Sequence, residues 1–280
     1  NVIDNRWEQE IWVYIENTNL SIIQSSCIGL EHVTTLFVEK RPVIYDVDEQ
    51  LLCDNETTLD MYSVFDTSTL QDLILGNTTD STILPFQDTS KFTIEYTYID
   101  SDGTAVNSTT LPATINLTNQ KIDIKLTNTV GVSQPFESIG SINFKVFQTP
   151  TPFSGIKIEE CDDEESGADD DGISVFDIDL DTFKRSLFIN PLDTTSPEVQ
   201  DFNDFEFNFS LYDNNDVLIS GPAKSIDPKI SAENGYYIIS EISNPLSTAF
   251  TLSCESSVRV DFIVNSLPSF DIDDPTIVCL

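Results

Sequence analysis

The sequence predicts an all-β protein in which one β-sandwich domain is repeated along the chain. Three observations lead to this prediction. Landmarks recur with a period of about 110 residues. Each period contains segments in which apolar and polar residues alternate, and clusters of Gly, Asn, Asp, Pro and Ser separate these segments.

The repeat is clearest when the cysteines are used as anchors. Three prolines each stand eleven positions before a cysteine. These pairs are Pro42 and Cys53, Pro150 and Cys161, and Pro268 and Cys279. The tetrapeptide SVFD also recurs, starting at Ser63 and at Ser174. Landmarks that keep the same order and spacing indicate a true internal repeat.

The repeat divides the chain into four parts. Residues 1–42 are predicted to be the C-terminal part of a preceding repeat, and residues 269–280 the start of a following one. Residues 43–150 and 151–268 are then two complete β-sandwich repeats. The 280 residues are therefore expected to be a piece of a longer repeat array.

Strands within each repeat follow from the alternation. The segments FTIEYTYI from Phe92 and FEFNFSLY from Phe205 alternate with period two and are rich in aromatic and β-branched residues. Each leads into an Asp-rich hairpin turn, at Asp100–Gly103 and at Asp213–Asp216. About seven short strands per repeat fit an immunoglobulin-like sandwich. The predicted fold class is all-β, with tandem immunoglobulin-like β-sandwich domains arranged end to end, and with short helical turns after each SVFD.

The charge of the chain limits its partners. The sequence has 13 Lys and Arg against 48 Asp and Glu, a formal net charge of -35. Such a surface repels nucleic-acid phosphate and anionic lipid headgroups, so we expect no nucleic acid as partner and cations as counterparts. With 39% hydrophobic residues, the chain can still build folded cores. No apolar run reaches 18 residues, so no direct membrane insertion is predicted.

The composition also argues against an enzyme. The single histidine, His32, lies in GLEHVTT near a predicted strand, where a surface or edge histidine is expected. Carboxylate pairs suited to glycoside hydrolysis occur by chance among 48 acidic residues, and a repeated unit offers no single cleft. We therefore predict no catalytic and no cofactor-binding residues.

Two segments carry a resemblance to a known family. The acidic opening CDDEESGADDDGISVFDIDL from Cys161 and the ending FIVNSLP from Phe262 resemble the tandem repeats of large flavobacterial surface proteins. These are the gliding-motility-type adhesins of Bacteroidetes, exported by the type IX secretion system. The resemblance covers essentially the whole chain. The first repeat departs from it, because its opening CDNETTLDMYSVFD is shorter and less acidic and Phe136 stands where Cys254 stands one repeat later.

The resemblance implies a function and a location. It implies a structural or adhesive stalk segment of a secreted protein at the outer cell surface. Its expected partners are neighbouring repeats of the same chain, surface glycans, or other copies in a filament. The alternative is a carbohydrate- or protein-binding immunoglobulin-like module of a secreted protein.

The acidic opening of the second repeat is a candidate calcium site. Calcium prefers six to eight oxygen ligands in a flexible loop, and Gly172 permits a sharp turn there. The predicted ligands are Asp162, Asp163, Asp169 and Asp171, with Asp177 as a further one from the adjoining strand. The alternative is a solvated run of charges that keeps an exposed loop soluble.

Five cysteines in an exported chain suggest disulfides. One possibility keeps bridges within a repeat and pairs Cys161 with Cys254. The other joins repeats, pairing Cys27 with Cys53 and Cys254 with Cys279. We expect the first pairing, Cys161 with Cys254, because both cysteines are placed at the same end of the predicted sandwich.

Overall fold

A computed structural model describes most of the chain. The described residues are 2–3, 6–16, 28–39, 41–54, 59–76, 92–128, 136–162, 171–193, 195 and 197–268. The chain divides into two compact units. One comprises Asn1–Gln50 and Tyr62–Lys145, and the other Leu51–Met61 and Val146–Leu280. Within the described ranges, no helix is long and apolar enough to cross a membrane.

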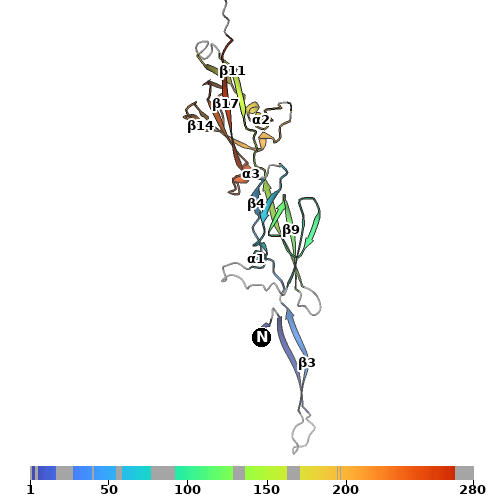
Figure 1. The fold of residues 1–280 in the computed structure, drawn as a ribbon. Helices are drawn as coiled ribbons and strands as arrows, with labels where there is room; N and C mark the ends of the chain where they lie inside the picture. The colour runs from blue at the N-terminus through green and yellow to red at the C-terminus, as the bar shows by residue number, and fades with distance from the viewer. Residues whose placement is uncertain are drawn as a thin grey trace, which may run out of the picture. The chain divides into compact units, whose positions relative to one another are not determined.

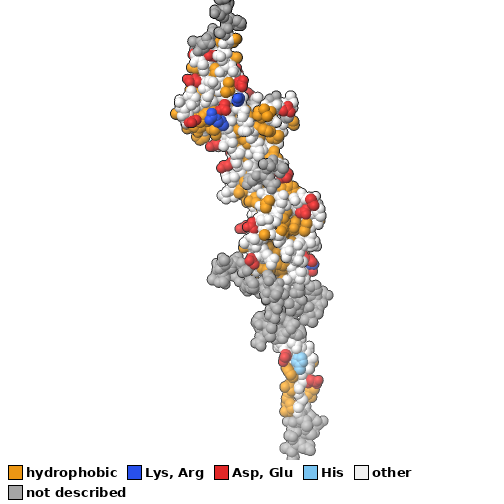
Figure 2. All heavy atoms as spheres, in the orientation of Figure 1, with side chains coloured by type: hydrophobic (Ala, Val, Ile, Leu, Met, Phe, Trp, Pro, Cys, Tyr) orange, Lys and Arg blue, Asp and Glu red, His pale blue; other side chains and the backbone are white. Residues whose placement is uncertain are grey.

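The chain begins with a β-hairpin. Strand β2 (Arg6–Glu16) pairs antiparallel with β3 (Ile28–Glu39), and β1 (Val2–Ile3) pairs with β2. Large apolar side chains lie exposed along this hairpin (Figure 2), among them Trp12, Tyr14, Ile15, Ile28, Leu30 and Val33. A two-stranded hairpin is only marginally stable by itself. Such a surface is what the last strands of a preceding repeat would leave, and the assignment of residues 1–42 stays a prediction.

The first sandwich follows in the first unit (Figure 1). Its elements are β4 (Gln50–Cys53), β5 (Ser63–Asp66), α1 (Leu70–Ile74), β6 (Phe92–Ile99), β7 (Ala105–Ser108), β8 (Thr114–Leu117), β9 (Gln120–Asn128) and β10 (Glu137–Phe147). A five-stranded sheet has the order β4-β10-β9-β6-β7, and β5 pairs with β8 in a second sheet. The end of β4, from Leu51 onward, is grouped with the second unit.

The second sandwich repeats the elements of the first in the same order and adds two more. They are β11 (Ile156–Cys161), β12 (Ile173–Asp177), α2 (Leu180–Ser186), β13 (Glu206–Tyr212), β14 (Leu218–Ala223), β15 (Lys229–Glu233), β16 (Tyr237–Ser243) and β17 (Glu255–Asn265), with a 3-10 turn η2 (Phe202–Asp204) and a short helix α3 (Pro245–Thr248). Its sheets are β11-β17-β16-β13-β14 and β12-β15.

The two sheet orders are identical when β4–β10 are matched to β11–β17. Among the residues that the structure describes, each sandwich thus has five strands in one sheet and two in the other, which agrees with the about seven strands that the sequence predicts. The fold is all-β and consists of tandem immunoglobulin-like sandwiches. The two short helices predicted after SVFD are also present, as α1 and α2.

The repeated SVFD motif places one aromatic ring in each core. Phe65 of β5 contacts Phe144 of β10 edge to face, with ring centroids 5.0 Å apart. The matching pair in the second sandwich is Phe176 of β12 and Phe262 of β17, at 4.6 Å. All four rings are buried. Because β5 and β12 belong to the smaller sheets, these pairs join the two sheets of each sandwich.

The two Asp-rich turns are hairpins, as predicted. Gly103 donates its backbone N–H to the Asp100 carbonyl at 3.0 Å and has φ of 81°. In the second sandwich Asp216 donates to the Asp213 carbonyl at 3.2 Å and has φ of 62°. Asp tolerates this left-handed conformation better than most residues do. The turns join β6 to β7 and β13 to β14.

Candidate functional site

A disulfide bond is the main covalent feature of the second unit. Cys53 and Cys254 are bonded, with Cα atoms 5.5 Å apart and a sequence separation of 201. Both cysteines are buried together with Phe147, and Leu51 and Leu252 pack against them. Disulfides persist in oxidising compartments, which agrees with the predicted extracellular location.

The backbone around Cys254 is fixed by local hydrogen bonds. Its N–H donates to Ser247 Oγ at 3.3 Å, and Ser247 Oγ donates to the Asn244 carbonyl at 2.8 Å. Asn244 donates its own N–H to the Cys254 carbonyl at 2.9 Å. The Asn244 side chain also caps α3 by accepting from Leu246 N, and its Nδ2 donates to the Gln148 carbonyl at 2.8 Å. The loop therefore holds the bonded Cys254 sulfur in one defined position.

The predicted pairing of Cys161 with Cys254 is wrong. Cys254 is bonded to Cys53, and Cys161 is a free, exposed cysteine. The reason lies in strand direction, because β11 pairs parallel with β17 and Cys161 stands opposite Asn265. Cys254 precedes the other end of β17, a strand of 11 residues. The two ends are about 36 Å apart, far beyond disulfide reach.

The alternative pairing of Cys254 with Cys279 is wrong as well, whereas Cys27 and Cys279 themselves lie outside the described residues. One sequence signal pointed towards the observed bond. Phe136 occupies in the first repeat the place that Cys254 occupies in the second, so Cys53 lacks a partner within its own repeat. That absence indicates a bond from Cys53 to another repeat.

Asp162, a predicted calcium ligand, begins the acidic segment after β11. Its side chain is 2% exposed, and Oδ2 accepts the backbone N–H of Gly172 at 2.8 Å. Its other oxygen, Oδ1, is buried and has no hydrogen-bond partner among the described residues. Asp171 accepts from Ile173 N at 3.0 Å. Asp163 and Asp169 lie outside the described residues.

The same loop closure occurs in the first sandwich. Asp54 follows β4, is 3% exposed, and accepts the backbone N–H of Met61 at 3.0 Å through Oδ2. Met61 and Gly172 both have positive φ, 61° and 78°. Because the less acidic copy shares this arrangement, the buried Asp has a structural role in closing the loop. A cation is an additional role for Asp162 that remains a prediction.

Asp177 does not join Asp162. It ends β12, whereas Gly172, the partner of Asp162, immediately precedes that strand. The Asp177 carboxylate instead lies 3.8 Å from Lys229 Nζ on the paired strand β15. Within the described residues, no group of three or more His, Cys, Asp or Glu side chains is placed to hold a metal ion.

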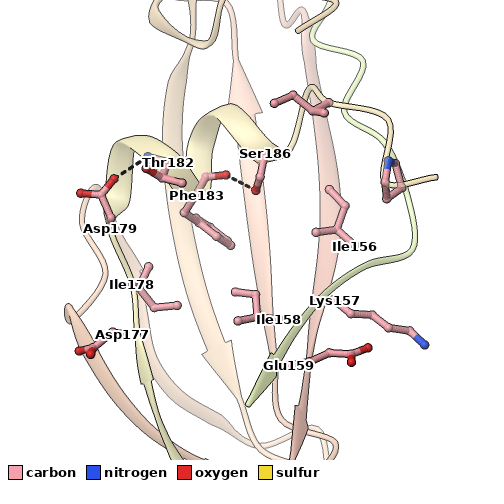
Figure 3. A pocket seen from close by; sticks show the side chains of 12 residues that line it. Ile156, Lys157, Ile158, Glu159, Asp177, Ile178, Asp179, Thr182, Phe183 and Ser186 are labelled. Carbon is pink, nitrogen blue, oxygen red and sulfur yellow. Dashed lines mark hydrogen bonds between the residues drawn. The ribbon is translucent and has the colours of Figure 1, made fainter. Parts of the chain in front are cut away.

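An apolar groove of about 600 Å³ lies between β11, β12 and α2 (Figure 3). Ile156 and Ile158 come from β11, Ile178 follows β12, and Phe183 comes from α2. Asp179 stands at the rim and caps α2 by accepting from Thr182 N at 2.8 Å. Hydrogen bonds from Thr182 lower the pKa of the Asp179 carboxyl. The lining suits apolar side chains of a ligand.

Tyr237 does not offer an exposed aromatic face for a sugar ligand. Tyr237 of β16 is 7% exposed. Its ring stacks on Tyr212 at 5.0 Å, and the Arg259 guanidinium lies 3.7 Å from the ring centroid. Its hydroxyl donates to Asp216 at 2.9 Å. These contacts give Tyr237 a packing role in the sandwich.

His32 has the surface position that the sequence predicts. It lies exposed in β3, with Nε2 3.0 Å from Thr35 Oγ1 and its ring 5.1 Å from that of Trp12. Neither neighbour completes a catalytic arrangement of nucleophile and base.

Comparisons with known proteins concern the fold. No protein-family model matches the sequence, and no curated protein matches it. Among solved structures, the insect immune protein hemolin is 8% identical, with 94% of this chain and 72% of hemolin covered and a TM-score of 0.32. Sidekick-1 immunoglobulin domains 1–4 are 9% identical, with 93% and 70% covered and a TM-score of 0.19. At these scores the likeness carries no argument, and the sandwich assignment rests on the strand order described above.

Proposed function

We propose that this chain is a load-bearing segment of a secreted, cell-surface repeat protein, a stalk of the flavobacterial gliding-adhesin type. Two features support the proposal. The same sandwich occurs twice in succession, and no catalytic arrangement is found among the described side chains. The observation that carries it is the Cys53–Cys254 bond, which joins the first strand of one repeat to the loop before the last strand of the next.

This bond changes how the chain responds to tension. A pull on both ends of the chain passes along the covalent path of fewest bonds. That path enters at Cys53 and leaves at Cys254, so it bypasses a loop with a sequence separation of 201. The bypassed segment includes β5 to β16 and would extend by on the order of 700 Å if unfolded. The oxidised chain therefore keeps most of both sandwiches out of the load path.

Single-molecule pulling of the full chain tests the proposal. With the chain held by its two termini, the oxidised protein should show no extension step from the loop between Cys53 and Cys254. The same molecules in dithiothreitol should gain an extension on the order of 700 Å in total. Cys161→Ser is the matched control and should behave as the unsubstituted chain. Equal extension with and without reductant would contradict the load-bearing function.

Calcium stabilisation is part of this proposal. The support is the acidic segment 163–171 directly after Asp162, whose Oδ1 is buried as that of Asp54 is. Calcium at millimolar concentration should raise the melting temperature of the chain, and Asp162→Asn should abolish the rise. Asp54→Asn is the matched control, because Asp54 makes the same loop closure without an acidic segment. A rise that persists in Asp162→Asn, or no rise at all, would remove calcium from the account.

A second candidate function, the binding of a protein ligand, is favoured by an asymmetry between the sandwiches. The groove beside α2 is lined by Ile156, Ile158, Ile178 and Phe183. At the places of Ile156 and Ile158, counted back from the matching cysteines, the first sandwich has Asp48 and Gln50, which line the surface beside α1 together with Tyr45, Val47 and Leu73. An apolar fluorescent probe such as anilinonaphthalene sulfonate should bind the native chain, and Ile158→Asp should abolish this binding. Unchanged probe fluorescence in Ile158→Asp would exclude the groove.

A further inference from the structure

Cys161 and Cys53 occupy the same place in the two sandwiches. Each is the last residue of a first strand, β11 and β4, and each precedes a buried Asp that closes a loop. The backbone confirms the match, because Asp54 N donates to the Phe147 carbonyl at 2.8 Å and Asp162 N to the Asn265 carbonyl at 2.9 Å. Phe147 and Asn265 are the last residues of β10 and β17.

Cys254 has an equivalent position in the first sandwich as well. Asn244 N donates to the Cys254 carbonyl at 2.9 Å, and Asn128 N donates to the Phe136 carbonyl at 3.0 Å. Cys254 and Phe136 each stand immediately before the last strand of their sandwich. The chain thus has two cysteine positions per repeat, one after the first strand and one before the last.

These two positions cannot bond within one repeat. Parallel pairing of β11 with β17 puts Cys161 opposite Asn265, at the end of β17 remote from Cys254. A cysteine in either position therefore needs a partner from another copy of the repeat. Cys53 shows which copy, since its partner Cys254 belongs to the next repeat along the chain.

We propose that Cys161 forms the same bond with the cysteine before the last strand of the next copy of this repeat. Its thiol is exposed and not bonded in this chain. Formation of the bond joins two sulfur atoms and releases two protons and two electrons. A protein disulfide or glutathione disulfide accepts them by thiol–disulfide exchange. The result is a ladder of bonds in which every repeat is linked to its successor, except where a residue such as Phe136 replaces the cysteine.

Inserting a second copy of residues 151–268 between Pro268 and Ser269 of the full chain tests this proposal. After oxidation with glutathione disulfide, non-reducing peptide mapping should find Cys161 bonded to the Cys254 of the inserted copy. The existing Cys53–Cys254 bond should remain. A control chain carries Cys254→Phe in the inserted copy, which gives that copy the residue that the first repeat has at Phe136. In this control chain Cys161 should react fully with iodoacetamide.

Two results would overturn the proposal. One is a Cys161 that still reacts with iodoacetamide although hydrogen exchange shows the inserted copy to be folded. The other is a bond from Cys161 to Cys254 of its own repeat in the Cys53→Ser variant of the 280-residue chain, where we expect both thiols to be alkylated once the chain is unfolded in denaturant. This second test needs no insertion. The proposal rests on the proposed function only in assuming that repeats follow one another. Peptide mapping detects the bond without applying force, so the bond can fail this test while the load-bearing function passes the pulling experiment, and the reverse.

Discussion

The two sandwiches share one strand order but solve three packing problems differently. Tyr96 in β6 stands where Phe209 stands in β13, Gly140 in β10 where Val258 stands in β17, and Phe136 where Cys254 stands. The shared features, such as the Phe pairs between sheets, define the fold. The differing ones show that each copy has its own interior and its own covalent links. A repeat in this chain is therefore a scaffold that tolerates local change.

Removal of the disulfide should have the largest effect. The double variant Cys53→Ser, Cys254→Ser should unfold at lower denaturant, with a loss on the order of 4 to 5 kcal/mol, because the bond closes a very long loop. Cys161→Ser should leave the stability unchanged, since that thiol is free. Urea unfolding followed by circular dichroism measures both. Equal stability of the double variant and the unsubstituted chain would show that the bond does not hold the structure together.

The difference between Tyr96 and Phe209 predicts an alkaline weakness of the first sandwich. Tyr96 is fully buried, its hydroxyl has no partner among the described residues, and burial raises its pKa to about 12. A raised pKa means that the folded state disfavours the charged phenolate. The free energy of unfolding of the first sandwich is therefore undiminished below the ordinary pKa near 10. It falls by about 3 kcal/mol as the pH rises towards 12.

Tyr96→Phe should remove most of this alkaline loss. At neutral pH it should also stabilise the first sandwich by about 1 kcal/mol, because a buried hydroxyl without a partner disappears. The matched variant Phe209→Tyr should destabilise the second sandwich. Thermal unfolding at pH 7 and at pH 11 checks these outcomes. An alkaline loss that is the same in Tyr96→Phe would contradict the assignment to this phenol.

The pair Gly140 and Val258 predicts that alanine destabilises both sandwiches for opposite reasons, overpacking at Gly140 and lost burial at Val258. A Cβ on Gly140 would lie 2.7 Å from Ile44 Cγ2, so Gly140→Ala should destabilise the chain by about 1 to 3 kcal/mol through overpacking. Val258 is 6% exposed, and Val258→Ala should cost about 2 kcal/mol through lost burial. Adding Ile44→Ala should restore stability to the Gly140→Ala variant but not to the Val258→Ala variant. A double variant of Gly140 and Ile44 no more stable than Gly140→Ala would refute the close approach.

The helix caps give the smallest expected effect. Asp179 caps α2 through its hydrogen bond from Thr182 N, whereas Thr69 at the start of α1 makes no side-chain cap bond. Asp179→Ala should lower the melting temperature by about 2 to 4 °C, and Thr69→Ala should not. The lowered pKa of Asp179 means that this contribution is present above the ordinary pKa and is lost as the pH falls below it. A change that is the same at pH 3 and pH 7 would argue against the cap.

The sequence carried enough information for the strands and turns but not for the covalent link. Alternation around Phe92 and Phe205 and the turns at Asp100 and Asp213 follow from local chemistry, which is why their predictions are confirmed. The partner of Cys254 depends on whether the first strand runs parallel to the last. No local pattern encodes that direction, so the sequence-based prediction puts Cys161 at the wrong end of the sandwich.

The acidic segment shows a second limit of sequence reasoning. Its composition suggests a cation, yet the buried Asp162 and the turn at Gly172 recur as Asp54 and Met61 in a loop with few carboxylates. Loop closure and cation binding use the same residue type. The second oxygen does not separate them either, because Oδ1 is buried in both Asp162 and Asp54. What differs is the number of carboxylates that follow in the sequence.

Non-reducing peptide mapping of the 280-residue chain shows directly whether Cys53 is bonded to Cys254. After alkylation of free thiols and proteolysis, we expect a cross-linked pair of peptides that contains Cys53 and Cys254, together with an alkylated peptide that contains Cys161. A cross-linked pair of Cys161 with Cys254 would place both cysteines at one end of the sandwich. It would contradict the parallel pairing of β11 with β17, and with it the covalent link between successive repeats.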